Sequence, residues 1–145
     1  MKVVVQRVES SSVEVENKIV GKIDQGLMVL VGFTEGDDLE IIKYMVNKII
    51  NLRVFDDENG IMNLSVKDIK GEILSVSQFT LYGDAKKGNR PSYIEALKGE
   101  EATKLYDLFN EELRKSSLKI ETGIFGADMK VSLVNDGPIT IIIEK

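Results

Sequence analysis

The stretch "KVVVQRVESSSVEVENKIVGKIDQGLMVLVGF", residues 2–33, determines the predicted fold class. Short runs of β-branched residues alternate in it with Ser, Asn, Gly and Asp-Gln-Gly breaks, which is typical of consecutive antiparallel strands. We therefore predict four strands in this part of the chain. They lie near residues 2–8, 12–16, 18–24 and 26–33.

The apolar pattern changes its period after this stretch. In residues 34–55 apolar side chains recur at spacings of three and four, which predicts an amphipathic helix with Asp37 or Asp38 as its N-cap. Residues 100–117 predict a second helix, and residues 91–99 a short one that begins at Pro91. The apolar side of the second helix is expected to carry Ala102, Leu105, Leu108, Phe109 and Leu113.

The remaining segments complete the predicted domain. Residues 56–66 are rich in turn signals, residues 71–84 return to a strand pattern, and two closing strands are expected near 129–134 and 139–144. No repeat or linker divides the chain. We predict a single α+β domain over residues 1–145, with a mainly antiparallel, barrel-like curled sheet and two main helices packed on it.

Composition excludes several kinds of chemistry. The chain has no histidine and no cysteine, so a Ser-His-Asp triad, a thiolate nucleophile and metal sites built from these residues are ruled out. Its net charge of −5 argues against a broad basic surface that coats nucleic acid, although a local basic patch is compatible with it. Without an apolar run of membrane-spanning length or signal-peptide features at "MKVVVQRVES", we expect a soluble cytoplasmic protein with no membrane association.

The segment "SVSQFTLYGD", residues 75–84, is the first candidate for function. A strand period of two places Gln78, Thr80 and Tyr82 on one face and Ser77, Phe79 and Leu81 on the other. A glutamine amide beside a hydroxyl can hold a polar substrate, and a threonine hydroxyl can act as a nucleophile if a base activates it. The alternative is the solvent-facing polar side of an ordinary strand.

The segment "AKKGNRPSY", residues 85–93, forms a basic loop. Lys86, Lys87 and Arg90 surround Gly88, and Tyr93 follows closely. Clustered cations can contact phosphates and an aromatic ring can stack on a base, but a solvated charged loop has the same composition.

A glycine-rich segment, "GIFGADMKVSLVNDGPIT", covers residues 123–140. Its glycines suggest close backbone approach, whereas Phe125 and Met129 are first interpreted as core residues. Gly137-Pro138 interrupts a strand pattern, and either a hairpin turn or a rigid backbone device explains the interruption.

The segments at 52–66, 71–93 and 123–140 together closely resemble the D-aminoacyl-tRNA deacylases of the common bacterial and eukaryotic type. The resemblance covers essentially the whole chain. It is most specific at the Ser-Gln-Phe-Thr motif, Ser77 to Thr80, and at the Gly-Pro motif, Gly137-Pro138. It implies hydrolysis of the ester between a D-amino acid, or glycine on a noncognate tRNA, and the terminal ribose of tRNA, without a metal or organic cofactor.

The resemblance also implies a homodimer with its active sites at the interface. The Gly-Pro motif of one subunit, with a cis peptide, would enter the pocket of the other and set chirality. Phe125 and Met129 would line the pocket for the terminal adenine or the amino acid, and Lys86, Lys87 and Arg90 would contact tRNA.

Catalysis would use Ser77, Gln78, Phe79 and Thr80, with backbone N–H groups around Phe79 and Thr80 as the oxyanion site and the ribose hydroxyl assisting water. A rival mechanism makes Thr80 the nucleophile. Two alternative functions remain open at this point, a non-catalytic nucleic-acid-binding protein and a deacylase specialised for glycine.

Overall fold

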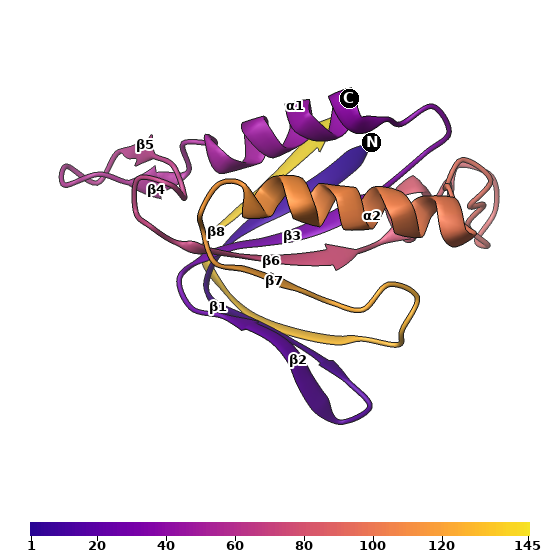
Figure 1. Cartoon of the computed structure of the whole chain (residues 1–145), viewed down its shortest axis with the longest axis horizontal. Coiled ribbons are helices and arrows are strands. Elements are labelled where there is room, and N and C mark those ends of the chain that lie inside the picture. Colours follow the sequence, from indigo (N-terminus) through magenta and orange to yellow (C-terminus); the bar gives the residue numbers. More distant parts are fainter.

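Strand β1 (Lys2–Val15) organises the sheet in the computed structural model, which describes residues 1–145. It pairs antiparallel with β8 (Lys130–Glu144) along nearly its whole length. Its two halves also pair antiparallel with two further strands. Residues 2–8 pair with β3 (Gly26–Gly32), and residues 11–15 pair with β2 (Lys18–Ile23). The sheet is therefore strongly curved around β1 (Figure 1).

The prediction of separate strands near 2–8 and 12–16 is wrong, because β1 is continuous through its serines. Ser11 donates its hydroxyl to the Ser132 carbonyl at 3.0 Å, and Ser10 and Ser12 pair with β8. Serine has little intrinsic preference for strands, but a partner along the same edge satisfies its backbone and decides the structure. The closing strands near 129–134 and 139–144 are likewise one strand, β8.

The other side of β3 extends the sheet with parallel strands. β6 (Glu72–Ser77) pairs parallel with β3, and β7 (Ile120–Thr122), which the sequence did not predict, pairs parallel with β6. Helix α1 (Leu39–Ile50) lies in the connection from β3 to β6, and α2 (Gly99–Arg114) in that from β6 to β7. The predicted α+β class is confirmed, with a barrel-like sheet that is mixed because these crossovers make strands parallel.

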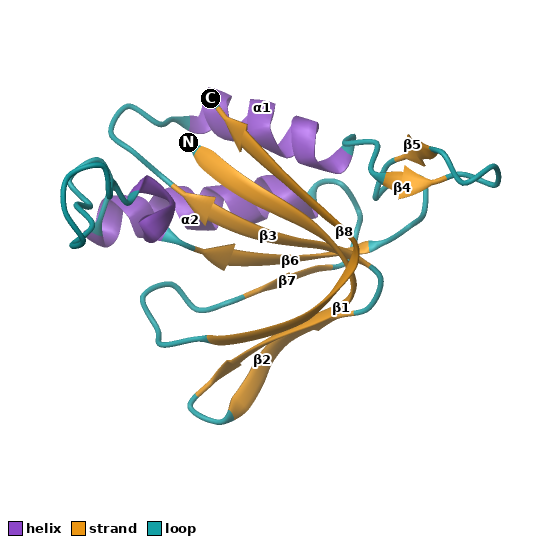
Figure 2. Ribbon diagram, turned by 180° about the vertical axis from the view of Figure 1, so that it is seen from behind, coloured by secondary structure: helices purple, strands orange, loops and turns teal.

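Both helices cover one face of the sheet, as Figure 2 shows from behind. Alternation along β1 and β3 sends Val3, Val5 and Val29 into the core beneath the helices. Ile42, Met45 and Phe109 meet them from α1 and α2. A second buried cluster fills the concave side of the curved sheet and consists of Val8, Val13, Ile23, Met28, Leu74 and Val76.

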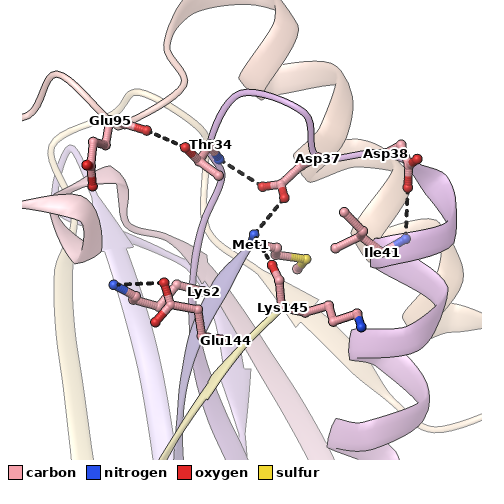
Figure 3. A network of polar contacts seen from close by, with 9 residues as sticks. All are labelled: Met1, Lys2, Thr34, Asp37, Asp38, Ile41, Glu95, Glu144 and Lys145. Atoms are coloured by element: carbon pink, nitrogen blue, oxygen red, sulfur yellow. Dashed lines mark hydrogen bonds and ion pairs between the residues drawn. The ribbon is translucent and has the colours of Figure 1, made fainter.

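Asp38 is the N-cap of α1, and its carboxylate accepts the Ile41 N–H at 2.9 Å. Asp37, the other predicted candidate, accepts the Thr34 N–H at 2.8 Å and pairs with the Met1 amino group at 2.6 Å. That amino group also donates to the Lys145 carbonyl at 2.8 Å. Both ends of the chain are thus held beside the start of α1 (Figure 3).

Two local predictions in the middle of the chain are wrong. Residues 91–98 form a bridge, a turn and loop and not a short helix, since the Leu97 N–H donates to the Phe33 carbonyl and Asp84 pairs with Ser92, and Gly99 already begins α2. Residues 79–82 form a short 3₁₀ helix, η1 (Phe79–Tyr82), where a strand was predicted. The hairpin of β4 (Phe55–Asp56) and β5 (Met62–Leu64) occupies the predicted turn-rich region.

Neither α-helix has the length and apolar character needed to cross a membrane.

Candidate active site

The Ser-Gln-Phe-Thr motif lies where β6 ends and the chain turns into η1. The Gln78 N–H extends the pairing with β3 by donating to the Val31 carbonyl at 2.7 Å. Gly32 permits this close turn, because a Cβ there would lie 2.9 Å from the Gln78 carbonyl oxygen. The predicted shared strand face is wrong, but the Gln78 amide still contacts the Thr80 hydroxyl at 2.6 Å. Tyr82, predicted beside them, is buried.

A cavity of about 270 Å³ opens beside this turn. One wall comes from the end of β6 and the start of η1, and the other from the segment between β7 and β8 together with the start of β8. The lining residues are Val76, Ser77, Gln78, Phe79, Phe125, Gly126, Ala127, Met129 and Val131. The structure therefore brings together five predicted site residues from distant parts of the sequence, whereas Thr80 does not line the cavity and is hydrogen-bonded to Gln78, which does.

The second wall is positioned by a backbone bond and a close approach. The Gly123 N–H donates to the Ser75 carbonyl on β6 at 2.9 Å. A Cβ at Gly123 would lie 2.5 Å from the Met129 sulfur, so glycine there lets Met129 fold back toward the sheet. Phe125 and Met129 are partly buried and have a surface in the cavity.

Gly137-Pro138 lies within β8 and forms no hairpin turn. Asn135 pairs with Val8 and Thr140 with Gln6, so residues 136–139 stand opposite the single residue Arg7. The extra residues form a bulge in which the Gly137-Pro138 peptide is cis and Gly137 has φ +127°. Both residues are exposed, and neither lines the cavity of their own chain.

Arg7 holds this bulge, and the sequence analysis missed it. Its Nε donates to the Asp136 carbonyl at 3.0 Å and faces the Asp136 carboxylate at 3.2 Å. Nη1 donates to the Val54 carbonyl at 2.7 Å and lies 3.5 Å from Asp56. With only 7% of its surface exposed, Arg7 is a buried cation that joins β1, β8 and the β4–β5 hairpin.

The basic loop stands next to the cavity. Phe79 contacts Tyr93 edge to face, with 5.3 Å between ring centroids, which links the loop to the cavity wall. Lys86, Lys87 and Arg90 are exposed and take part in none of the ion pairs of the structure. Their charges are therefore available to a partner.

The chemistry of the site rests on hydroxyl, amide and backbone groups. Thr80 is bonded to an amide, which does not act as a base, and no cluster of acidic residues is arranged to hold a metal ion. In the same turn, burial and the nearby Asp37, Glu144 and Glu95 raise the pKa of Tyr82 further above its ordinary value, so its phenol does not serve as a base at neutral pH. Such a site can bind and orient a reactive ligand without supplying a strong base.

Fold and site together define a small α+β domain with a histidine-free and cysteine-free cavity at the end of a parallel strand. The chain belongs to the D-Tyr-tRNA(Tyr) deacylase family, whose sequence model matches residues 4–144.

Relatives of the chain match it over nearly its full length. It is 59% identical over 144 residues to a D-aminoacyl-tRNA deacylase of Clostridium botulinum (strain Alaska E43 / Type E3) and 58% identical to one of Thermosipho africanus. Each alignment covers 99% of this chain and 97% of the relative.

Two solved structures are similar to the fold. One, described as c-Myc DNA Unwinding Element Binding Protein, has a TM-score of 0.93 and 46% identity, covering 100% of this chain and 99% of that one. The other, described as a probable eukaryotic D-amino acid tRNA deacylase, has a TM-score of 0.85, covers 98% of this chain and 97% of that one, and at 18% identity shows the fold alone.

The contacts of Arg7 predict a large cost for its removal. We expect Arg7→Met to lower the free energy of unfolding by about 2–4 kcal/mol, because it strands the buried Val54 carbonyl and frees the bulge. Arg53→Met is the matched control: its Nε donates to the Asn63 carbonyl at an exposed site, and it should cost less than about 1 kcal/mol. Urea unfolding at one protein concentration measures both, and equal small losses would contradict the assignment.

Proposed function

We propose that the protein, acting as one domain over residues 1–145 in the cytoplasm, hydrolyses the ester between a D-amino acid and the terminal ribose of tRNA. The proposal is carried by the full-length similarity to relatives named D-aminoacyl-tRNA deacylase. The cavity supports it, because Ser77, Gln78 and Phe79 of the Ser-Gln-Phe-Thr motif line one of its walls. The deciding experiment follows release of free amino acid from paired D- and L-aminoacyl-tRNA by the purified protein.

Chirality is set in this proposal by Gly137 and Pro138 of a second copy of the chain. Met129 lies at the cavity just before β8 begins, and Gly137 is eight residues further on. That separation is about 25 Å along an extended strand, so the bulge is far along the strand from its own cavity. The exposed apolar side chains Val134, Ile141 and Ile142 flank the bulge and support a homodimer interface there.

A stiff backbone in the site would explain why D-amino acids and glycine are accepted and L-amino acids are rejected. Carbonyl oxygens around Gly137 and Pro138 would hold the substrate ammonium and leave no room for an L side chain. Rigid placement by Arg7 turns a small misfit into a large difference in free energy. Glycine has no side chain to reject, so glycine on a noncognate tRNA is a substrate of the same site.

Catalysis would come mainly from position and from the backbone. Phe79 and Thr80 begin η1, and the first N–H groups of such a turn have no carbonyl partner within it. We assign these two N–H groups to the oxyanion and the neighbouring ribose hydroxyl to the activation of water. An aminoacyl ester is reactive enough that this arrangement needs no cofactor and no histidine.

A non-catalytic nucleic-acid-binding protein is the second candidate. It is favoured by the 46% identical structure described as a DNA unwinding element binding protein. Release of D-amino acid from charged tRNA decides for the deacylase, whereas binding of nucleic acid without any release decides for the second candidate.

Replacement of the Gly-Pro pair tests the chirality gate. We expect Gly137→Ala/Pro138→Ala to lower the ratio of D- to L-aminoacyl-tRNA hydrolysis at least about tenfold, because a displaced backbone no longer excludes the L side chain. Thr140→Ser, on the same strand and next to the bulge, should keep the ratio. A double variant that still ignores L-aminoacyl-tRNA would exclude Gly137 and Pro138 as the gate.

Replacement of the Thr80 side chain distinguishes the two mechanisms, catalysis by the backbone and the ribose hydroxyl or attack by Thr80. Thr80→Val keeps both backbone N–H groups, so we expect its single-turnover rate to remain within about tenfold of the original. A substrate lacking the terminal 2′-hydroxyl should react far more slowly. Near-complete loss in Thr80→Val, or full activity on the 2′-deoxy substrate, would favour Thr80 as the nucleophile.

The basic loop is tested by salt dependence. Changing Lys86, Lys87 and Arg90 to Gln should weaken binding of different tRNAs similarly, and the slope of log K against log salt should fall by about 1 for each phosphate that the loop no longer neutralises. A control with Lys18, Lys67 and Lys70 changed to Gln removes the same charge from exposed positions away from the cavity. Equal slopes for the two triple variants would show that the loop is ordinary surface.

A further inference from the structure

Tyr106 on α2 is joined to the strand that carries the Ser-Gln-Phe-Thr motif. Its hydroxyl donates to the Ser75 carbonyl at 2.8 Å, in a bond that is fully buried. Ser75 lies on β6 two residues before Ser77, the first motif residue in the cavity wall. Tyr106 itself is only 3% exposed and does not line the cavity. It therefore acts on this wall through the backbone.

The other wall of the cavity is tied to the same atom and to the same side chain. The Ser75 carbonyl also accepts the Gly123 N–H at 2.9 Å, and Gly123 precedes Phe125 by two residues. The Tyr106 ring packs against Phe125 with 5.9 Å between centroids and 45° between planes. One side chain outside the cavity thus contacts Phe125 in one wall and, through Ser75, the strand that leads into the other wall.

We call Tyr106 with its contacts to Ser75 and Phe125 the clamp. Its hydrogen-bond donor, the Tyr106 hydroxyl, stays protonated over the neutral pH range. Burial raises the pKa of Tyr106 above that of an ordinary tyrosine, which is itself protonated at neutral pH, so the phenol keeps the proton that it donates to the Ser75 carbonyl. A buried hydrogen bond with a fixed donor holds its two partners in one relative position more firmly than an exposed bond does.

We propose that Tyr106 is a positioning residue, which fixes the spacing between the β6 wall and the Phe125 wall and thereby the orientation of the ester at the backbone N–H groups. The kinetic part of this inference rests on the proposed deacylation. Small displacements matter in such a site, because a misplacement of about 1 Å can cost about a hundredfold in rate. The clamp should therefore influence the chemical step more than overall binding of tRNA.

The test compares Tyr106→Phe with Phe109→Leu. The first keeps the ring against Phe125 and removes only the hydroxyl, and the second perturbs the buried core on the same helix at a residue that does not line the cavity. We expect Tyr106→Phe to lower the single-turnover rate at saturating D-aminoacyl-tRNA about fivefold, with KM nearly unchanged. Phe109→Leu should keep the rate per folded molecule even where it lowers the melting temperature more.

A measurement without turnover keeps the inference independent of the proposed function. With ¹³C-labelled methionine methyl groups, the chain gives five signals, one of them from Met129 in the cavity wall. Tyr106→Phe should shift the Met129 signal and Phe109→Leu should not. If the original protein releases no amino acid, the deacylase proposal fails and this spectrum alone decides on the clamp.

Two results would overturn the inference. One is an unshifted Met129 signal in Tyr106→Phe. The other, in an active protein, is an unchanged single-turnover rate in Tyr106→Phe, or an equal loss of rate per folded molecule in Phe109→Leu.

Discussion

The pairing of β1 with β8 on one side and with β3 and β2 on the other is the constraint on which the rest of the structure depends. A strand paired on both edges leaves no freedom for its partners to shift independently. Between Gln6 and Val8, β1 has one residue, while β8 has residues 136–139 in the matching interval. The surplus backbone must leave the ladder at that point. The Gly137-Pro138 bulge is therefore placed by the register of two long strands.

The cavity depends on the opposite side of the sheet. There β3, β6 and β7 run parallel, so that the end of β6 meets the segment that follows β7. That segment forms the second wall and continues directly into β8. The second wall of the cavity and the bulge thus lie on one stretch of chain, separated by the first part of β8. This separation is why the two predicted parts of the site meet only between two copies of the chain in the function that we propose.

Local signals allowed part of this structure to be predicted. Helix α1 and its cap at Asp38 follow from spacing and capping, which depend on neighbours in sequence. The continuity of β1 and β8 and the short strand β7 depend on distant partners, and the sequence did not show them. Arg7 was missed although it continues the inward alternation of Val3 and Val5, where a lone cation indicates buried acceptors. Tyr106 was also missed, although it follows Ala102 by four residues on the buried side of α2.

Arg7 and Tyr106 share one role in a candidate site that has no histidine or cysteine. Each is a buried side chain that donates to backbone carbonyl groups, Arg7 to Val54 and Asp136 and Tyr106 to Ser75. Arg7 is bonded to the backbone beside the Gly-Pro motif, and Tyr106 is bonded to β6 two residues before the Ser-Gln-Phe-Thr motif. Backbone N–H and carbonyl groups are chemically alike throughout a chain. What such a group binds or stabilises therefore depends on where the surrounding structure holds it. In such a site the residues that hold the backbone matter as much as those that face the ligand, and they are found by following hydrogen bonds inward from the cavity and the bulge.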